Sequence, residues 1–153
     1  MSSDFSHVLF ICTGNYYRSR FAEYVFNYHA IRTQPALPWR AFSRGLAIDQ
    51  VSPGAGHLSP FTLQALSDKG IDAAAYRPPI ALGEQDLALA GRVIALKHAE
   101  HHPLMGKKFP HWQERIEYWH VHDIDYAHPD QALPEIESLV AALLAALTAE
   151  QTG

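Results

Sequence analysis

The chain has 153 residues, of which 48% are apolar, so it is long enough to bury one well-filled core and short for two. Its 12 basic and 16 acidic residues give a net charge of -4 without a basic run that could follow a phosphate backbone, so we expect no nucleic-acid partner. No run approaches the roughly 20 apolar residues that cross a bilayer, and the single cysteine cannot close an intrachain disulfide. These features predict a cytoplasmic domain that does not contact a membrane.

Short apolar runs alternate with segments of helical period in the first half of the chain. Residues 7–12 (HVLFIC) form a strand-length apolar run, and residues 18–31 carry apolar side chains at helical spacing. Residues 39–45 predict a second strand. Residues 59–70 begin with Ser before Pro and end with Gly, which are typical residues for the start and the end of a helix.

The second half continues the alternation. Residues 92–96 (RVIAL) predict a third strand and residues 115–121 a fourth. From residue 134 onward a helix is predicted, with one apolar face that contains Ile136, Leu139, Val140, Leu143, Leu144 and Leu147. Strands that alternate with helices imply a parallel sheet covered on both faces, in a single α/β domain over residues 1–153.

The only cysteine lies at the end of the first predicted strand, at the sheet edge where open parallel sheets bind ligands. The five residues after Cys12 lead into the helix predicted from Arg18, and a helix N-terminus offers unpaired N–H groups to an anion. Gly14 and Asn15 tolerate positive φ, which lets successive amides converge on one anion. Arg18 adds a planar fork for two phosphate oxygens, and the same positive field favours the thiolate of Cys12. The stretch predicts a phosphate-binding loop that carries a nucleophile.

Taken alone, a cysteine at the end of an apolar run is typical of a small buried side chain. The functional interpretation depends on five residues that occur together within eight positions: Cys12, Gly14, Asn15, Arg18 and Ser19. Two other phosphate loops fit less well, because the stretch has no lysine for a Walker-type loop and no further glycine for a dinucleotide fingerprint.

The stretch CTGNYYRS at residues 12–19 resembles the signature of the low molecular weight protein tyrosine phosphatases, which runs Cys-x-Gly-Asn-x-Cys-Arg-Ser after the first strand. Weaker similarities follow in the same order: FSRG at 42–45, ALSDKGID at 65–72, RVIAL at 92–96 and YWHVHDIDY at 118–126. The resemblance implies a flavodoxin-like fold with a four-stranded parallel sheet flanked by helices on both faces. It also implies hydrolysis of a phosphorylated protein or a small aryl phosphate, without a cofactor.

The resemblance also implies a role for each residue of the loop. Cys12 would attack phosphorus while Arg18 and the loop amides hold the phosphate oxygens. Ser19 would hydrogen-bond the thiolate, and Asn15 would brace the loop with the supporting residue Ser43. The implied phosphate-binding residues are Thr13, Gly14, Asn15, Tyr16, Tyr17, Arg18 and Ser19.

Asp123 matches the family's general acid, which protonates the leaving oxygen and then activates water. The family has a proline after this aspartate where the chain has Ile124, so Asp125 competes for the role. Three further positions depart from the family pattern: Tyr17 replaces a second cysteine, Arg20 replaces a proline, and Tyr76 replaces a loop histidine before Arg77.

Aromatic and histidine side chains raise two further hypotheses. Tyr16, Tyr17 and Tyr126 are candidates to wall the cleft and stack on a substrate ring, although tyrosines at loop edges are equally typical of half-buried packing. The stretches HAEHH (98–102) and HVHD (120–123) have metal-ligand spacing. The first is predicted on a short solvated helix, and the phosphocysteine route requires no metal, so we expect no metal site.

Two alternative functions stay open. An arsenate reductase on the same scaffold typically needs further cysteines to relay a disulfide, so with Cys12 alone it would depend on an external thiol. A module that binds a phosphorylated partner without turnover is the other alternative, and the departures from the family pattern motivate it. A retained Cys12, Arg18 and Asp123 argue against simple binding, since binding alone needs neither a nucleophile nor an acid.

Overall fold

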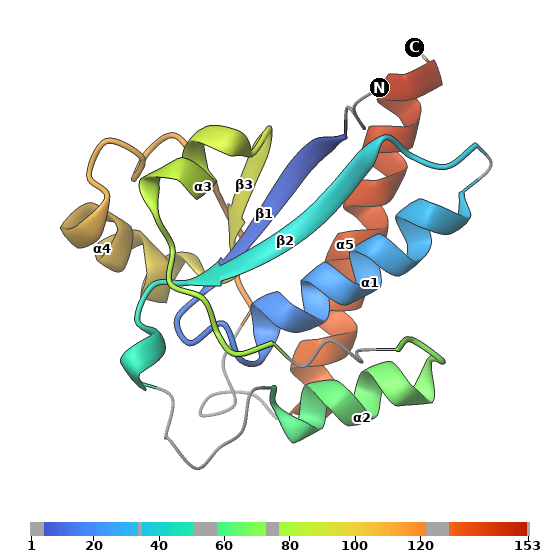
Figure 1. The fold of residues 1–153 in the computed structure, drawn as a ribbon, viewed down its shortest axis with the longest axis horizontal. Coiled ribbons are helices and arrows are strands. Elements are labelled where there is room, and N and C mark those ends of the chain that lie inside the picture. The colour runs from blue at the N-terminus through green and yellow to red at the C-terminus, as the bar shows by residue number, and fades with distance from the viewer. Residues whose placement is uncertain (1–4, 34, 51–57, 73–76, 122–128, 153) are drawn as a thin grey trace.

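Four parallel strands form the centre of the fold (Figure 1). The computed structural model describes residues 5–33, 35–50, 58–72, 77–121 and 129–152. The strands are β1 (Ser6–Cys12), β2 (Trp39–Gly45), β3 (Arg92–Ala95) and β4 (Glu117–Tyr118), in the order β2-β1-β3-β4. The helices are α1 (Arg18–Arg32), α2 (Pro60–Asp68), α3 (Glu84–Leu89), α4 (His98–Lys108) and α5 (Pro129–Thr152), with a short 3-10 turn η1 (Ile48–Gln50). The predicted α/β class with a four-stranded parallel sheet is confirmed.

Helices cover both faces of this sheet. α1 and α5 lie on one face, and α3 and α4 lie on the other (Figure 1). β1 is a central strand, and its residues Val8, Leu9, Phe10 and Ile11 are all 0% exposed. A strand covered on both faces directs apolar side chains both ways, which explains why the sequence of β1 is a continuous apolar run.

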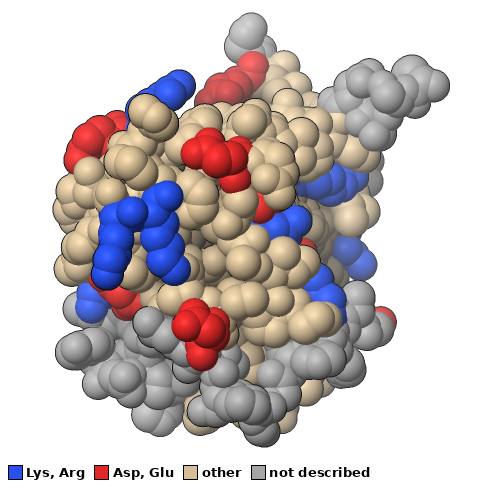
Figure 2. Space-filling view, turned by 60° about the vertical axis from the view of Figure 1, so that its left-hand side comes forward, with Lys and Arg blue, Asp and Glu red and all other residues tan. Residues whose placement is uncertain are grey.

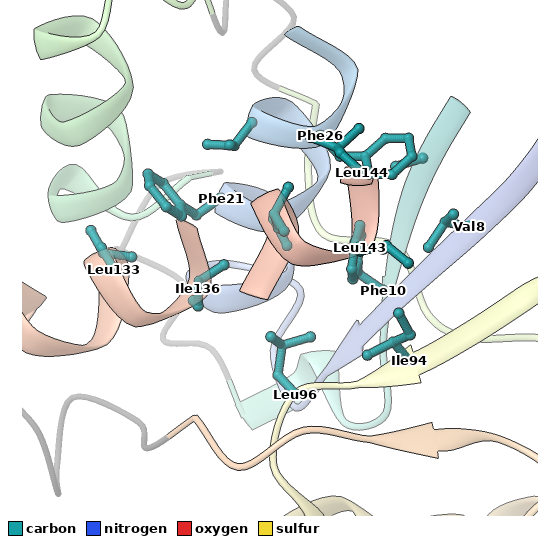
Figure 3. Close-up of a cluster of buried hydrophobic side chains, with 14 of the residues drawn as sticks. Val8, Phe10, Phe21, Phe26, Ile94, Leu96, Leu133, Ile136, Leu143 and Leu144 are labelled. Atoms are coloured by element: carbon teal, nitrogen blue, oxygen red, sulfur yellow. The ribbon is translucent and has the colours of Figure 1, made fainter. Parts of the chain in front are cut away.

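The larger core lies between β1, α1 and α5 (Figure 3). Phe10 of β1, Phe21 and Phe26 of α1, and Ile136 and Leu144 of α5 contribute large side chains to it. Burying a side chain of this size contributes about 1.5–3 kcal/mol. Because α1 starts at the loop after β1, this packing also fixes the helix end of that loop.

α5 is long and apolar enough to cross a membrane by length and composition. The window Gln131–Gln151 has a mean hydropathy of 1.6, and 39% of it is buried inside the protein. Ala132, Ile136, Val140 and Leu147 are 0% exposed against the core. Packing against α1 and the sheet therefore accounts for the apolar face of this helix.

Several elements differ from the sequence prediction. The strand predicted at 115–121 is reduced to β4, because it lies at the sheet edge and pairs with β3 at two positions. α5 begins at Pro129 instead of residue 134, with Pro134 inside the helix. The helix α3 was not predicted; its N-terminus at Gly83 is closed by a hydrogen bond from the Gly83 N–H to the carboxylate of Asp86 at 2.9 Å.

Candidate active site

The predicted phosphate loop joins the end of β1 to the start of α1. Cys12 is the last residue of β1 and Arg18 is the first of α1. The N–H groups of Leu46 and Ala47 donate to the carbonyl oxygens of Cys12 and Thr13 at 2.9 and 2.8 Å. These bonds continue the pairing of β1 with β2 beyond the strands and fix the first two residues of the loop.

A glycine at the end of β2 permits this close approach. A Cβ atom on Gly45 would lie 2.9 Å from the carbonyl oxygen of Thr13 and 2.7 Å from Cγ2 of Ile48. Both distances are shorter than real Cβ contacts, so a side chain at this position would push β2 and η1 away from the loop.

The thiol of Cys12 lies beside a hydroxyl. Cys12 is 2% exposed, and its Sγ is 3.0 Å from Oγ of Ser19. Ser19 Oγ also accepts a hydrogen bond from Nδ2 of Asn15 at 3.0 Å. A hydroxyl that already accepts from an amide is well placed to donate its hydrogen to a neighbouring sulfur, and such a donor stabilises a thiolate.

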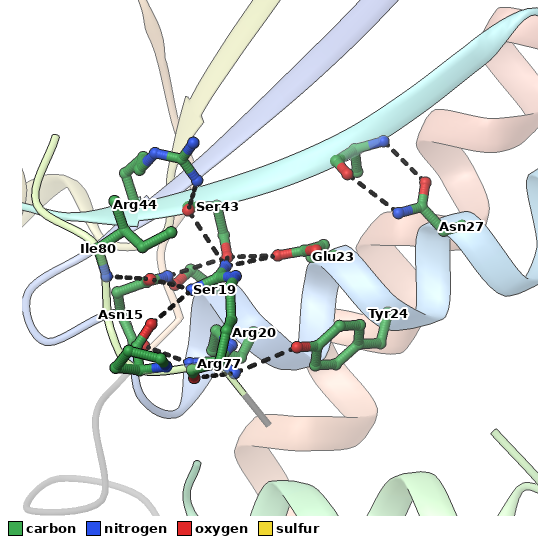
Figure 4. Close-up of polar contacts among 12 residues, drawn as sticks. Asn15, Ser19, Arg20, Glu23, Tyr24, Asn27, Ser43, Arg44, Arg77 and Ile80 are labelled. Carbon is green, nitrogen blue, oxygen red and sulfur yellow. Dashed lines mark hydrogen bonds and ion pairs between the residues drawn. The ribbon is translucent and has the colours of Figure 1, made fainter. Parts of the chain in front are cut away.

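Asn15 is the left-handed residue of the loop, with φ of 51°. Its amide is bonded at all four positions (Figure 4). Nδ2 donates to Ser19 and Ser43 at 3.0 and 2.9 Å, and Oδ1 accepts from Nη1 of Arg77 and the N–H of Ile80, both at 3.0 Å. A buried amide with every donor and acceptor satisfied has one favourable orientation. The contact between Asn15 and Ser43 expected from the resemblance is present.

Arg20, which stands where the family has proline, lies beneath the loop (Figure 4). It is 0% exposed, and its Nη1 donates to the carbonyl oxygen of Asn15 at 3.1 Å. Its Nη2 donates to the hydroxyl of Tyr24 at 3.1 Å and to the carbonyl oxygen of Arg77 at 3.0 Å. A proline could make none of these bonds. Arg20 therefore ties the left-handed residue to α1 and to the segment that begins at Arg77.

Arg77 belongs to the same network of hydrogen bonds. Its Nη2 lies 3.1 Å from Oε1 of Glu23 and 3.0 Å from Oγ of Ser43, and the Ser43 hydroxyl donates to Glu23 at 2.6 Å. Burial lowers the pKa of the Arg77 guanidinium, while the charge of Glu23 opposes that shift. Two arginines, Arg20 and Arg77, and the carboxylate of Glu23 thus support the loop.

Arg18, expected to hold phosphate oxygens, is 2% exposed and bonded from two directions. Its Nη1 donates to the carbonyl oxygen of Val121 at 3.1 Å. Its Nη2 donates to Oε2 of Glu100 at 3.0 Å. This carboxylate partner was not predicted from the sequence.

Glu100 lies in the first turn of α4 and brings a negative charge to the loop. Its Oε2 also accepts from the Thr13 hydroxyl, and Nε2 of His101 lies 3.3 Å away. Burial acts to raise the pKa of Glu100, but the hydrogen bond of His101, the charge and hydrogen bond of Arg18, and the Thr13 hydroxyl outweigh it. The pKa of Glu100 is therefore held well below its usual range, and the side chain is a carboxylate at neutral pH.

His101 corrects the expectation that residues 98–102 are solvated. It is 0% exposed, and its Nδ1 accepts from the N–H of Lys97 at 3.0 Å. The hydrogen-bond network assigns the ring proton to Nε2, which lies 3.2 Å from Oγ1 of Thr13. Helix α4 is longer than expected and turns this histidine toward the loop, while His98 and His102 stack on each other at 4.7 Å between ring centroids.

The histidine-rich stretches do not form a metal site among the residues that the structure describes. Within those residues no group of three or more His, Cys, Asp or Glu side chains is placed to hold a metal. The ring of His120 lies 6.0 Å from that of His98, and His122 is outside the described residues.

The tyrosines of the loop occupy different environments. Tyr17, which was a candidate either to wall the cleft or to pack, is 5% exposed and packs in the larger core. Tyr16 is partly buried, and burial raises the pKa of its hydroxyl. Its carbonyl oxygen accepts from the N–H of Ser59, where α2 approaches the loop, at 2.9 Å.

Five residues named from the sequence lie outside the described part of the chain: Tyr76, Asp123, Ile124, Asp125 and Tyr126. The general acid expected among them stays a prediction.

Several residues of the site were missed by sequence reasoning, and two of them had a signal in the sequence. Arg20 had a signal, because it interrupts the family pattern where proline is expected, but its bonds depend on the fold. Glu100 had a weaker signal. It follows β3 by a few residues, and the carboxyl ends of β1 and β3 meet at the same sheet edge.

Comparison with solved structures shows the same fold in several enzymes. The low molecular weight protein tyrosine phosphatase from T. tengcongensis is 25% identical with a TM-score of 0.75, and the match covers 92% of this chain and 98% of that one. The YwlE arginine phosphatase from Geobacillus stearothermophilus is 22% identical with a TM-score of 0.75 and covers 96% of each chain. A thioredoxin-dependent arsenate reductase from Corynebacterium glutamicum is 19% identical with a TM-score of 0.70, and covers 98% of this chain and 65% of that one.

Comparison with sequence families is more specific. No curated protein sequence matches the chain. The family described as low molecular weight phosphotyrosine protein phosphatase matches residues 7–152, which contain every described residue of the site. The chain therefore belongs to the low molecular weight phosphotyrosine protein phosphatase family, a family of hydrolases.

Proposed function

We propose that this chain is a cytoplasmic phosphomonoesterase of the protein tyrosine phosphatase type that forms a phosphocysteine on Cys12. The observation that carries the proposal is the contact between Cys12 Sγ and Ser19 Oγ at 3.0 Å, at the point where β1 ends and α1 begins with Arg18. A nucleophile, a hydroxyl that stabilises its thiolate and a cation for phosphate thus share one loop.

In the proposed first step, the Cys12 thiolate attacks phosphorus opposite the leaving oxygen. The S–P bond forms as the P–O bond breaks, and Asp123 donates its proton to the leaving oxygen. Arg18 and the loop amides stabilise the charge on the three non-bridging oxygens. In the second step, water attacks phosphorus and gives a proton to Asp123. The S–P bond breaks, and Cys12 leaves as a thiolate that accepts a hydrogen bond from Ser19.

The described part of the chain supports Asp123 by its position in the sequence. Arg18 donates to the carbonyl oxygen of Val121, which precedes Asp123 by two residues. The segment that carries the acid therefore follows directly from a residue bonded to the phosphate-binding arginine. Asp125 follows Val121 by four residues and remains the competing acid.

The same residues weigh against the two alternatives. The chain has one cysteine, so an arsenate reductase built on it would need an external thiol to resolve the oxidised sulfur. A phosphate-binding module without turnover would need neither a nucleophile nor the hydroxyl beside it. The contact between Cys12 and Ser19 favours turnover, because a hydroxyl beside the sulfur stabilises a thiolate that forms and leaves.

The proposed substrate is a phosphorylated protein or a small aryl phosphate. Figure 2 shows basic and acidic side chains in small, separate groups on one face of the molecule. A surface of this kind suits a protein or a small molecule better than a nucleic-acid backbone, which is bound by a continuous basic track. Related structures include both tyrosine and arginine phosphatases, so phosphotyrosine and phosphoarginine belong in the same assay.

The test is phosphate release from a generic aryl phosphate, with and without a chelator. The wild-type protein should hydrolyse it equally in both conditions. Cys12→Ser should abolish turnover and still bind vanadate, because the loop amides and Arg18 remain. Arsenate reduction with an added thiol but no phosphate release would favour the reductase, and phosphate binding without turnover would favour the binding module.

A further inference from the structure

The arginine on which the proposed phosphate site depends is already paired with a carboxylate. Glu100 Oε2 accepts from Nη2 of Arg18 at 3.0 Å and from the hydroxyl of Thr13, the residue that follows the proposed nucleophile. His101 Nε2 lies 3.3 Å from the same oxygen. Three side chains, from the loop after β1, from α1 and from α4, therefore converge on one negative charge.

Glu100 is a carboxylate at neutral pH. The same neighbours hold the pKa of Glu100 well below its usual range against the effect of burial. His101 is 0% exposed and is itself fixed by the N–H of Lys97 at 3.0 Å, so the support for the carboxylate is rigid. The carboxylate is thus held in place beside Arg18 before a ligand binds.

The position of Glu100 lets it meet a ligand. Its side chain is 26% exposed, whereas that of Arg18 is 2% exposed, so the carboxylate lies on the solvent side of the ion pair. A phosphate dianion that binds Arg18 must displace this oxygen or lie close to it. In a partly buried site, like charges a few ångströms apart repel by an amount worth about a tenfold change in affinity or more.

We propose that Glu100 is a specificity-determining residue that makes the site select by charge. It disfavours free inorganic phosphate and substrates with acidic groups beside the phosphoryl group. It favours phosphorylated peptides with a basic side chain next to the phosphorylated residue, because that cation pairs with Glu100 once Arg18 turns to the phosphate. The inference rests on the proposed function, in which residues 12–19 hold the phosphoryl group.

The experiment compares Glu100→Gln with Glu114→Gln, a matched change at a carboxylate that is 76% exposed and paired with His102. Calorimetry with inorganic phosphate measures affinity without turnover. Glu100→Gln should bind phosphate roughly tenfold tighter than the wild-type protein, and Glu114→Gln should match the wild type. Equal or weaker binding by Glu100→Gln would overturn the proposal and make Glu100 a group that orients Arg18.

Turnover supplies the second measurement. The ratio of kcat/KM for a lysine-flanked over a glutamate-flanked phosphotyrosine peptide should favour lysine about tenfold in the wild type and fall toward one in Glu100→Gln. Glu100→Asp keeps the charge and should keep the preference. A ratio unaffected by Glu100→Gln, or lost in Glu100→Asp as fully as in Glu100→Gln, would contradict selection by charge.

Failure of the proposed function gives a different pattern. In that case the wild-type protein hydrolyses neither peptide at any concentration, while calorimetry still reports whether Glu100 opposes phosphate. Failure of the charge selection alone leaves wild-type turnover intact, with the same ratio in the wild type and in Glu100→Gln.

Discussion

Ser19 Oγ lies 3.0 Å from Cys12 Sγ, at the end of a chain of hydrogen bonds that runs from Arg77 through Asn15. The hydroxyl at the sulfur is therefore positioned by the same amide that adopts the left-handed conformation of the loop. Loop shape and the environment of the proposed nucleophile are fixed by one set of buried polar groups.

Ser19→Ala removes the hydrogen bond to sulfur and leaves Asn15 without one acceptor. We expect kcat to fall by roughly 10- to 100-fold, the effect of losing a hydrogen bond to a charged group worth about 1.5–3 kcal/mol. KM should change less, because Arg18 and the loop amides remain. Steady-state kinetics with an aryl phosphate checks this, and Ser67→Ala, at an exposed serine of α2, is the control. Unchanged kcat in Ser19→Ala would show that the contact has no catalytic role.

Asp123→Asn tests the proposed general acid. The variant should slow hydrolysis by roughly 10²- to 10⁴-fold, the usual contribution of positioned proton transfer. The loss should be smaller for substrates whose leaving group is already acidic, since these need less protonation. Asp125→Asn is the matched comparison. If Asp125→Asn causes the loss and Asp123→Asn does not, the family alignment is out of register at Ile124.

The strands and the loop of the site were predicted better than the residues that support the loop. β2 was predicted at the observed residues, 39–45, where a short stretch with Trp39, Ala41 and Phe42 ends at Gly45. β4 was predicted too long, since backbone pairing at a sheet edge depends on the neighbouring strand. Cys12 and Ser19 were predicted because they belong to a local motif, and a local motif can be recognised without knowledge of the fold.

The supports of the loop depend on contacts between distant parts of the chain. Arg20 bonds to Arg77, and Arg18 bonds to Glu100, across sequence separations of 57 and 82 residues. Helical periodicity indicates which face of a helix is apolar. Polar residues such as Glu100 and His101 are then expected to face solvent. Only the fold shows that this polar face of α4 turns toward the loop.

Arg20→Met tests whether the buried arginine braces the loop. Methionine keeps the length of the side chain but loses the bonds to Asn15, Tyr24 and Arg77. We expect the free energy of unfolding to fall by about 1–3 kcal/mol, because a buried carbonyl oxygen is left without its donor. Urea unfolding measures the change, with Arg32→Met at an exposed position of α1 as the control. Equal stability of both variants would contradict a structural role for Arg20.

The ion pair of Glu100 predicts a dependence of stability on pH. Because its folded pKa lies below the value of about 4.3 in an unfolded chain, the carboxylate contributes stability at pH values above about 4.3. That contribution is lost as pH falls from there through the lower folded pKa. Glu100→Gln should therefore be less stable than the wild type by about 1–3 kcal/mol at pH 7. The difference should shrink in acid.

Urea unfolding at pH 7 and at about pH 3.5 compares the full contribution of Glu100 with one that is partly lost. Glu114→Gln, at the exposed carboxylate, should differ little from the wild type at either pH. A stability difference between Glu100→Gln and the wild type that stays constant between the two pH values would contradict the low pKa of Glu100.

Oxidation tests the consequence of having Tyr17 where the family has a second cysteine. A substrate must reach the sulfur of Cys12 for the proposed function, so peroxide, which is smaller, should reach it too. The product is a sulfenic acid, which proceeds to irreversible forms unless a second thiol traps it as a disulfide. The chain has one cysteine, and Tyr17 is packed in the core at 5% exposure.

We therefore expect a timed peroxide pulse to inactivate the protein, vanadate in the loop to protect it, and dithiothreitol to recover little activity after long exposure. Intact mass should show oxygen added to Cys12 without a mixed disulfide. Tyr17→Cys should restore recovery if its sulfur lies within disulfide distance of Cys12, and the cavity it leaves in the core makes thermal unfolding a necessary control. Full recovery of the unmodified protein by dithiothreitol, with no adduct in the mass spectrum, would show that Cys12 is protected by something other than a second thiol.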